Sequence, residues 1–468
     1  MDQMRPSNHV ARAQLERMLR STPLLSAAEL AARAGVSVPT VLRILREQPP
    51  LVMRLGTTKN ARYVWRRALR GVVAPLPVYC VDVTGKGHEF TRLNLAAPQG
   101  AVMDLGARGW PVTPDHQSGW WDGLPYPFYD MRPQGFLGRH FAQHVAHDLQ
   151  VSANPMEWSD DDCIYALMLR GADTSGNLIV GDVAYALWNE QKINGDAPCA
   201  GADLIRHYAA LAERVVEAGI PGSSAAGEFP KFTTTRDLAG RQTPHVIVKF
   251  SGAETSSTVQ RWSDLLVCEH LALETLYASL NIAVAFSRII QHQGRTFIEV
   301  ERFDRIGAWG RSELVSLATL DAVFVGSIDL TWRAAVNGLE NCGLVGRRVV
   351  DDAHLLWWFG QLIANSDMHL GNLSFQFEPS VQKTPLLNIA PLYDMLPMFY
   401  APLSGGEVPA RIFNPRLPLP RERDIWLKAA TAALAFWKTA AEDSRVSVGF
   451  RSVCKENFLI LLGMMDKA

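Results

Sequence analysis

The second half of the chain shows a change of pattern that limits the folds open to it. Between residues 231 and 305, short alternating runs typical of strands lie on either side of one long helical pattern at 261–280. Beyond residue 312 helical patterns dominate, up to an irregular segment at 376–424. Strands and helices that are segregated along the chain in this way predict an α+β fold with two unequal lobes.

Length and composition indicate a globular protein of several domains. The chain has 468 residues, of which 48% are hydrophobic and 20% charged. It shows no apolar run of about 18 residues, the length that a membrane span needs. No apolar stretch resembling a signal peptide stands near the N-terminus, and the six cysteines form no C-x-x-C pair. We therefore expect a cytoplasmic protein with reduced cysteines and no membrane partner.

Residues 1–72 predict a separate basic domain. The first 70 residues hold 13 Lys and Arg against 4 Asp and Glu, a net charge of +9, whereas the remainder sums to −10. The segment 25–47 predicts two helices joined by a tight turn, with Ser26 and Ser37 as N-caps and Gly35 ending the first helix. Two alternating runs around residues 57–60 then predict a β-hairpin. With a further short helix at 10–20, the pattern is that of a winged helix-turn-helix.

A winged helix with this charge predicts DNA binding, because its second helix enters the major groove while the wing meets the phosphate backbone. The alternative is a domain that contacts another protein. The residues expected to face DNA are Ser37, Pro39, Thr40 and Arg43 on the second helix, and Lys59, Arg62, Arg66 and Arg67 on the wing.

Four polar residues in the second half suggest phosphoryl transfer. This chemistry needs a carboxylate at the acceptor hydroxyl, oxygen ligands for Mg²⁺ and a cation for the phosphates of ATP. In "NSDMHLGN" (365–372) Asp367 precedes Asn372 by five residues, which is the spacing of a kinase catalytic loop. "IAPLYDM" adds Asp394, and Lys249 interrupts the apolar strand "HVIVKF". Their order across the change from strands to helices predicts a two-lobed, protein-kinase-like fold that uses ATP and Mg²⁺.

The helix at 261–280 is expected to provide a carboxylate partner for Lys249. Glu269 shares an apolar face with Trp262 and Leu266, which would turn it inward. Asp264 lies nearer the helix start, where a carboxylate also suits the helix dipole. The sequence leaves both candidates open.

Several motifs resemble the HipA-type serine/threonine kinase toxins of bacterial toxin–antitoxin systems. They are, in order, "GSSAAGEFPKF", "HVIVKF", "VERFDR", "NSDMHLGNLSF" and "PLYDM". The resemblance covers about residues 220–400 and, more weakly, 77–220, where "DMRPQGFLGR" stands. One departure is that family members commonly carry a Gln-Lys pair where this chain has Phe229-Pro230-Lys231. A second departure is the basic N-terminal domain, since HipA-type toxins obtain DNA binding from a separate helix-turn-helix antitoxin.

The resemblance implies a role for each matching residue. Asp367 would be the catalytic base, His369 would support it in the same loop, and Asn372 and Asp394 would bind Mg²⁺. The implied ATP-binding residues are Lys249, paired with Asp264 or Glu269, and Ser224, Gly227 and Lys231 in a phosphate-covering loop. Glu301, Arg302 and Phe303 would line the adenine as the connection between the lobes, with Tyr393 on the other side of the base. Ser224, with Ser223 as its neighbour, would be the site of autophosphorylation.

The expected organisation is a winged helix-turn-helix at 1–72, a small β-rich subdomain at 73–150, a kinase N-lobe at 151–305 and a helical C-lobe at 306–468. The implied partners are a protein substrate such as an aminoacyl-tRNA synthetase or another translation factor, DNA through the head, a separate antitoxin, and a second copy on a palindromic DNA site.

Two other functions fit part of the pattern. A small-molecule phosphotransferase of the aminoglycoside or choline kinase type has a similar D-x-H-x-x-N loop. A winged-helix transcription regulator with a non-catalytic, kinase-like sensor domain would retain the fold without turnover.

Overall fold

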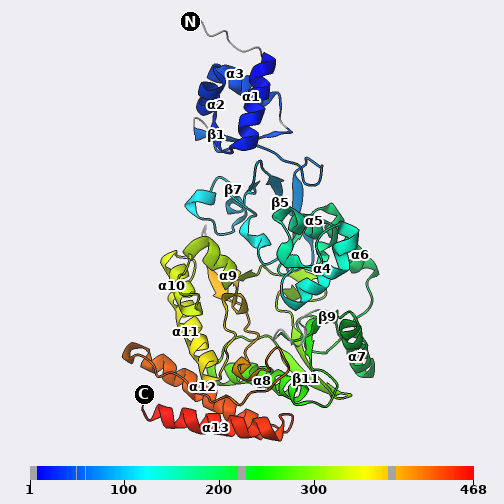
Figure 1. Ribbon diagram of the computed structural model, residues 1–468, viewed down its shortest axis with the longest axis vertical. Helices are drawn as coiled ribbons and strands as arrows, with labels where there is room; N and C mark the ends of the chain where they lie inside the picture. The colour runs from blue at the N-terminus through cyan, green and yellow to red at the C-terminus, as the bar shows by residue number, and fades with distance from the viewer. Residues whose placement is uncertain (1–7, 49, 58–59, 220–227, 378–385, 468) are drawn as a thin grey trace.

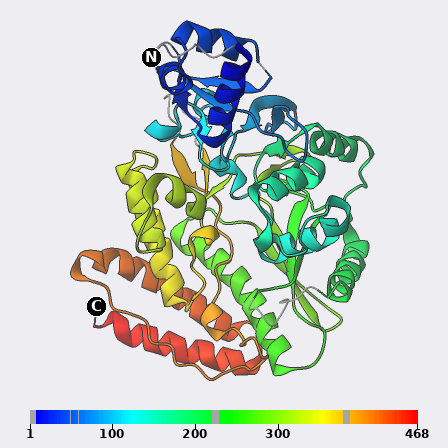
Figure 2. The same ribbon diagram turned by 45° about the horizontal axis from the view of Figure 1, so that its top comes forward.

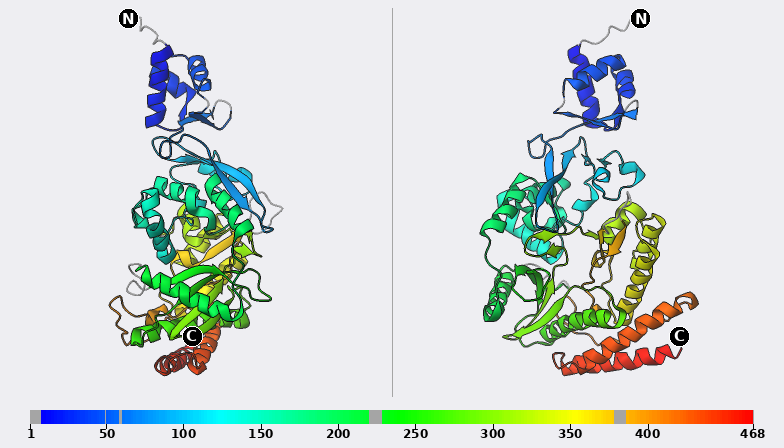
Figure 3. Two further views of the ribbon diagram at one scale, coloured as in Figure 1. Left: turned by 90° about the vertical axis from the view of Figure 1, so that its right-hand side faces the viewer. Right: turned by 180° about the vertical axis from the view of Figure 1, so that it is seen from behind.

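The computed structural model describes residues 8–48, 50–57, 60–219, 228–377 and 386–467. The units follow one another along the long axis, from a small N-terminal head at one end to a pair of C-terminal helices at the other (Figure 1). The head lies at the same extreme in the side and rear views (Figure 3).

The head consists of three helices and a three-stranded antiparallel sheet. Leu15, Leu30 and Ile44 from the three helices meet in its core. The sheet has the strand order β1-β3-β2. The elements are α1 (Asn8–Ser21), β1 (Leu25–Ser26), α2 (Ala27–Ala34), α3 (Val38–Arg46), β2 (Val52–Leu55) and β3 (Arg62–Trp65).

The ends of the head helices lie where the sequence predicts them. The backbone N–H of Glu29 donates to Ser26 Oγ at 3.2 Å, and that of Ser26 donates to Glu29 Oε2 at 2.8 Å, which forms a capping box. Gly35 ends α2 with a φ of 65°, a conformation that favours glycine. Ser37 caps α3 by accepting from the N–H of Thr40.

The middle unit is built on a five-stranded antiparallel sheet with the order β7-β6-β5-β4-β8. Its strands are β4 (Leu76–Val81), β5 (Gly87–Leu95), β6 (Ala101–Val102), β7 (Trp120–Trp121) and β8 (Leu178–Val180), and its helices are α4 (Gly135–Leu149), α5 (Asp160–Arg170) and α6 (Asp182–Asn194). β8 pairs with β4, and α5 and α6 contact β8. Residues 151–194 therefore belong with this unit, which corrects the boundary at 150; the pairing joins strands about a hundred residues apart, and no local pattern reveals it.

Buried contacts and ion pairs fix the head to the middle unit. Met53 and Val64 of the head cluster with Trp120 of β7. Arg67 binds Asp161 through two hydrogen bonds of 2.6 Å each. Arg66, just before it, donates to the carbonyl of Pro50 within the head. The expected phosphate contacts of Arg66 and Arg67 are thus corrected, because both side chains are used inside the protein.

A four-stranded antiparallel sheet, β11-β12-β10-β9, follows, with helices on both faces. The strands are β9 (Lys231–Thr235), β10 (His245–Phe250), β11 (Ser287–His292) and β12 (Arg295–Glu301), and the helices are α7 (Gly201–Glu217) and α8 (Ser257–Leu280). Side chains alternate along β10: Val246 and Val248 pack against α7, so Ile247 and Lys249 lie on the face toward α8.

The C-terminal part is mainly helical. Its helices are α9 (Leu317–Leu320), η7 (Asp321–Val325), α10 (Trp332–Asn341), α11 (Arg347–Leu362), α12 (Arg423–Glu442) and α13 (Val448–Met465). It also contains a hairpin, β13 (Arg305–Ile306) and β14 (Gly310–Arg311), and a small sheet of β15 (Val315–Ser316), β16 (Ser374–Phe377) and β17 (Leu387–Ile389). α12 packs against α8, α11 and α13, which joins the helical part to the four-stranded sheet (Figure 2). Within the described residues, no helix is long and apolar enough to cross a membrane.

Candidate active site

A buried ion-pair cluster lies between the four-stranded sheet and the helical part. Nζ of Lys249 donates to Glu269 Oε1 at 2.7 Å and to Oε2 at 2.9 Å, and it also contacts Asp394 Oδ1. The side chain of Lys249 is 7% exposed and that of Glu269 is fully buried. Strand alternation turns Lys249 toward α8, and the apolar face of α8 turns Glu269 inward. The cluster therefore joins β10, α8 and the segment after β17.

Asp264, the other candidate partner of Lys249, is bonded elsewhere. Its carboxylate accepts the backbone N–H of Ser447 at 2.7 Å and the hydroxyl of Ser447 at 2.6 Å, and Gln260 donates to it at 3.3 Å. Ser447 is the N-cap of α13. The expectation that Asp264 serves the ATP site is thus corrected: this carboxylate anchors the C-terminal helix on α8.

Mutual charges set the pKa values in the cluster. Burial acts to raise the pKa of Asp394, but the ammonium groups of Lys249 and Lys231 outweigh it and lower that pKa. Burial alone would lower the pKa of Lys249, whereas the carboxylates of Asp394 and Glu269 raise it. The pKa of Glu269 is raised to about 7, mainly by burial, with Lys249 opposing and Asp394 adding to the effect. Lys249 is therefore charged at neutral pH and lies beside a charged Asp394.

The loop between α11 and β16 is held by its own side chains and by neighbours. Asn365 accepts the N–H of Asp367 at 3.0 Å, a turn that an Asn two residues upstream favours. Asn372 donates its amide to the carbonyl of Asp367 at 2.8 Å. Trp332 donates to the carbonyl of His369 at 2.9 Å, and His369 Nδ1 accepts the N–H of Gly371 at 3.1 Å. The predicted loop therefore has a defined geometry, with Asp367 and Asn372 joined directly.

The carboxylate of Asp367 is open to solvent, with its side chain 54% exposed and Oδ1 4.0 Å from Nε2 of His369. Partial burial raises its pKa; His369 opposes this rise, and the carboxylates of Asp394 and Glu228 add to it. A reachable carboxylate with a raised pKa suits a group that accepts a proton.

Lys231 pairs with Lys249 on the neighbouring strand of the sheet and is linked through Glu228 to the middle unit. Its Nζ contacts Glu228 Oε1 at 3.2 Å. Glu228 also accepts the N–H of Phe136 at 2.8 Å and the guanidinium of Arg139 at 2.8 Å, both at the start of α4. Glu228 and Arg139 are site residues that no pattern in the sequence indicated. The motif "DMRPQGFLGR", part of the family resemblance, contains Arg139. Its contact with Glu228 shows that this motif joins the middle unit to the segment before β9.

Glu301 does not present its side chain to the face that carries Lys249. It pairs with Val246 in the sheet, so its side chain lies on the opposite face, where it accepts hydrogen bonds from Arg236 at 2.8 Å and Arg241 at 3.0 Å. The expected place of Glu301 beside the adenine, as part of the connection between the lobes, does not depend on this side chain and stays a prediction. Glu301 follows Glu299 by two residues, so strand alternation in the sequence already indicates that both side chains lie on one face.

Phe303 and Tyr393, which the resemblance places around the adenine, lie together in the structure. Their ring centroids are 5.5 Å apart with an interplanar angle of 32°. The hydroxyl of Tyr393 donates to the carbonyl of Gly371 at 2.9 Å and lies 2.8 Å from Ser374 Oγ. The aromatic pair is thereby linked to the loop of Asp367.

The residues expected to face DNA have different surroundings. Ser37 and Thr40 hydroxyls lie 2.9 Å apart at the start of α3. Arg43 pairs with Glu47 at 3.0 Å and Arg62 with Glu29 at 2.7 Å, and each of these side chains is about half exposed. Lys59, Ser223, Ser224 and Gly227 lie outside the described residues. Among the residues that the structure describes, no three His, Cys, Asp or Glu side chains gather as a metal cluster.

Two family models match the chain. Residues 223–451, which include the ion-pair cluster and the Asp367 loop, match the HipA-like C-terminal domain. The match identifies a HipA-like C-terminal domain and agrees with the resemblance seen in the motifs. Residues 72–189 match the middle domain of YjjJ-like toxins. Toxin YjjJ of Escherichia coli (strain K12) is 36% identical over 435 residues, which cover 92% of this chain and 93% of that protein. The chain belongs to the family of YjjJ-like, HipA-like toxins.

Two solved structures are similar at low identity. HipA of Shewanella oneidensis MR-1, in a complex with HipB and its operator DNA, is 15% identical, with a TM-score of 0.46 over 84% of this chain and 98% of that chain. The proinflammatory kinase CtkA of Helicobacter pylori is 14% identical, with a TM-score of 0.33 over 51% of this chain and 88% of that chain.

Proposed function

We propose that the chain is an ATP- and Mg²⁺-dependent serine/threonine protein kinase of the HipA toxin type. The observation that carries this proposal is the cluster of Lys249, Glu269 and Asp394, next to a loop in which Asp367 and Asn372 are joined. Phosphoryl transfer needs positioning, charge neutralisation and a proton acceptor, and these residues supply all three. Membership of the HipA-like family supports the same activity.

The residues present fit Mg²⁺ and ATP. Asn372 and Asp394 offer carboxamide and carboxylate oxygens, the hard ligands that Mg²⁺ prefers, and Lys249 offers a fixed ammonium to the phosphates. Bound Mg²⁺-ATP supplies the phosphoryl group and the cation that neutralises its charge. Phe303 and Tyr393 would hold the base from both sides. Because a planar ring needs about 3.5 Å on each face, the rings must separate from 5.5 Å to about 7 Å to admit it.

Asp367 performs the step that belongs to this chain. Its carboxylate accepts the proton of a serine or threonine hydroxyl while the hydroxyl oxygen bonds to the γ-phosphorus and the bond to ADP breaks. His369, 4.0 Å away, stabilises the unprotonated carboxylate. Lys249 keeps its charge beside Asp394 and Glu269 and so holds the phosphates throughout. The acceptor is a cellular protein, with a translation component such as an aminoacyl-tRNA synthetase as the class that the family suggests, and Ser223 or Ser224 as a site of autophosphorylation.

Labelled ATP tests this activity. The purified chain is incubated with Mg²⁺, γ-labelled ATP and a cell lysate, and labelled proteins are identified by phosphopeptide mass spectrometry. We expect label on protein with the wild type and with Asp424→Asn, an exposed carboxylate at the start of α12, but none with Asp367→Asn. Label on added small alcohols alone would favour a small-molecule phosphotransferase. Equal labelling by Asp367→Asn and the wild type would remove the basis of the kinase proposal.

We also propose that the head binds DNA. Its net charge of +9, its helix and sheet order, and the exposed Arg43 at the outer side of α3 support this. The full-length chain should shift its own upstream DNA in a gel at low salt, and Arg43→Ala should weaken the shift. The absence of any shift at low salt would refute it. Size-exclusion chromatography with that DNA tests for a homodimer and, with neighbouring gene products, for a separate antitoxin.

A further inference from the structure

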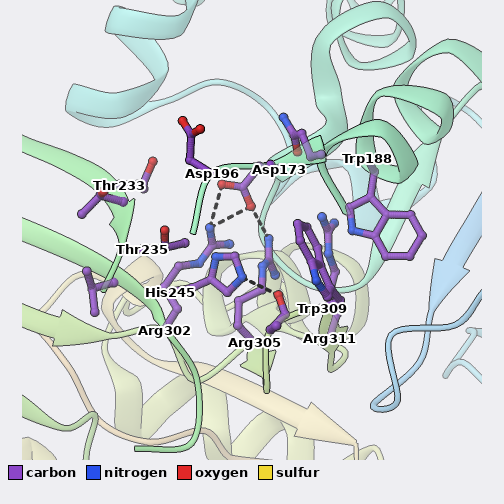
Figure 4. Close-up of a pocket in the computed structure, with 15 residues that line it drawn as sticks. Asp173, Trp188, Asp196, Thr233, Thr235, His245, Arg302, Arg305, Trp309 and Arg311 are labelled. Carbon is purple, nitrogen blue, oxygen red and sulfur yellow. Dashed lines mark hydrogen bonds and ion pairs between the residues drawn. The ribbon is translucent and has the colours of Figure 1, made fainter. Parts of the chain in front are cut away.

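A second ion-pair cluster joins the middle unit to the segment after β12. Asp173 stands in a short 3₁₀ turn, Gly171–Asp173, directly after α5. It accepts two hydrogen bonds from Nη1 of Arg302, at 2.9 and 3.1 Å, and one from Nη2 of Arg305 at 2.7 Å. Figure 4 shows the carboxylate of Asp173 between the two guanidinium groups. Arg305 also donates to the main-chain carbonyls of Thr174 and Gly176, at 2.6 and 3.0 Å, so the carboxylate of Asp173 adds a charged contact to main-chain contacts between the middle unit and this segment.

Charge balance makes Asp173 necessary to this cluster. The side chains of Arg302 and Arg305 are only 8% and 2% exposed. Asp304 neutralises one positive charge, since it binds Arg302 at 2.9 Å and Arg305 at 2.8 Å. Without Asp173, two buried guanidinium groups would share one carboxylate, and an uncompensated buried charge is costly. Asp173 and Asp304 thus offset the charges of Arg302 and Arg305, with Arg311 as a third buried arginine nearby.

The position of Arg302 gives the cluster its significance. Arg302 immediately precedes Phe303, whose ring contacts Tyr393. The N–H of Arg302 donates to the carbonyl of His245 at 3.0 Å, so its main chain is tied to the sheet. Its side chain is tied to the middle unit. Phe303 therefore extends from a residue that is held at both its main chain and its side chain.

A cavity of about 310 Å³ beside the cluster keeps one side of it accessible. Asp173, Arg302, Arg305, His245 and Thr235 line it. The side chain of Asp173 is 44% exposed, whereas the two arginines behind it are buried. Replacing Asp173 with Asn removes a charge without opening a hole in the core, so the variant is suited to a binding experiment.

We propose that Asp173 is a positioning residue for the adenine end of the ATP site: it fixes Arg302, and through Arg302 the main chain that holds Phe303 against the base. This rests on the kinase function proposed above. It assigns the middle unit a part in nucleotide affinity, because the carboxylate comes from outside the HipA-like C-terminal domain at 223–451. The phosphate end, which depends on Lys249, is a separate contact and should not respond.

Isothermal titration of the full-length chain tests this with three ligands in the presence of Mg²⁺: ATP, adenosine and inorganic tripolyphosphate. We expect Asp173→Asn to weaken ATP and adenosine by about 3- to 30-fold, the range of a coupling through an intermediate residue. Tripolyphosphate, which has no base, should bind within twofold of the wild type. Asp173→Glu, which keeps the charge, should bind adenosine with an intermediate affinity.

Glu213→Gln is the matched control. Glu213 on α7 is also a half-exposed carboxylate, 56% exposed, and it also pairs with a buried arginine of the same region, Arg295 at the start of β12, at 2.8 Å. It should bind all three ligands as the wild type does. If Asp173→Asn does not give folded protein, Asp173→Glu decides: weaker adenosine with unchanged tripolyphosphate supports the proposal.

Three results would overturn the inference: unchanged adenosine affinity in the Asp173 variants, an equal loss for tripolyphosphate, or an equal loss in Glu213→Gln. A wild-type chain that binds neither ATP nor tripolyphosphate would instead overturn the kinase proposal itself. The two failures are therefore distinguishable in one set of titrations.

Discussion

Exchanging the acid for its amide at two positions of α8 separates the carboxyl group that binds Lys249 from the one that anchors α13. Glu269→Gln removes the charge that orients Lys249, while Asp264→Asn removes the charge that accepts Ser447. Both side chains are buried, at 0% and 1% exposure, and both replacements keep the volume of the side chain. The pair therefore differs in what the carboxylate touches, and the two activities should differ accordingly.

The contacts set the expected magnitudes. Removing one partner of a buried pair costs about 3–5 kcal/mol of unfolding free energy, but Lys249 in Glu269→Gln keeps its contact with Asp394. We therefore expect a smaller loss of about 2 kcal/mol, within the range of a charged hydrogen bond. Loss of a fixed electrostatic contact in the transition state costs about 100- to 1,000-fold in kcat. Asp264→Asn should lose about 1–3 kcal/mol of unfolding free energy, with kcat within about threefold of the wild type.

Urea unfolding and transfer of label from γ-labelled ATP measure the two quantities on the same preparations. The reasoning predicts that the variants separate: one loses activity more than stability, and the other loses stability alone. A Glu269→Gln variant that keeps its kcat within threefold would show that the ion-pair geometry does not determine catalysis. A fully folded Asp264→Asn variant whose kcat falls 100-fold would show the same.

Three further outcomes follow from contacts described above. Trp120→Ala should lower the unfolding free energy by about 3–5 kcal/mol, because its buried ring contacts the head; urea unfolding with proteolysis of the head measures this. A double-mutant cycle of Arg67→Ala and Asp161→Ala should give a coupling of about 0.5–3 kcal/mol in the same assay, and no coupling would contradict the bidentate pair. Activity needs an unprotonated Asp367 and so falls as the pH drops through its raised pKa; because His369 lowers that pKa, His369→Ala should move the acid limb of kcat/KM to higher pH.

Local signals in the sequence were sufficient for the helix ends of the head and for the lysine of the active site. Ser26, Gly35 and Ser37 act through hydrogen bonds within four residues, so their pattern is visible in a short window. Lys249 stood out because an apolar strand seldom contains a lysine, and Asp367 and Asn372 because their spacing is fixed within one loop.

Contacts between distant segments were beyond the same reasoning. Asp264 and Glu269 are five residues apart, so they point about 140° apart on a helix, and the choice between them depends on where α13 and β10 pack. The ion pairs of Glu301 with Arg236 and Arg241 likewise join segments about sixty residues apart. The contacts of Arg67 with Asp161 and of Asp173 with Arg302 depend on how α5 packs in the folded chain, which no local pattern shows.

The helix α5 has an ion pair with a different part of the chain at each of its two ends. Its first turn holds Asp161, which binds Arg67 beside the head. Its last turn leads to Asp173, which binds Arg302, the residue before Phe303. Eleven residues of helix span about 16 Å, so one short helix separates the contact with Arg67 from the contact with Arg302. A chain whose head is on DNA would therefore present its active site at a constant offset from the duplex. Its protein substrates would be those that reach the chromosome at that point.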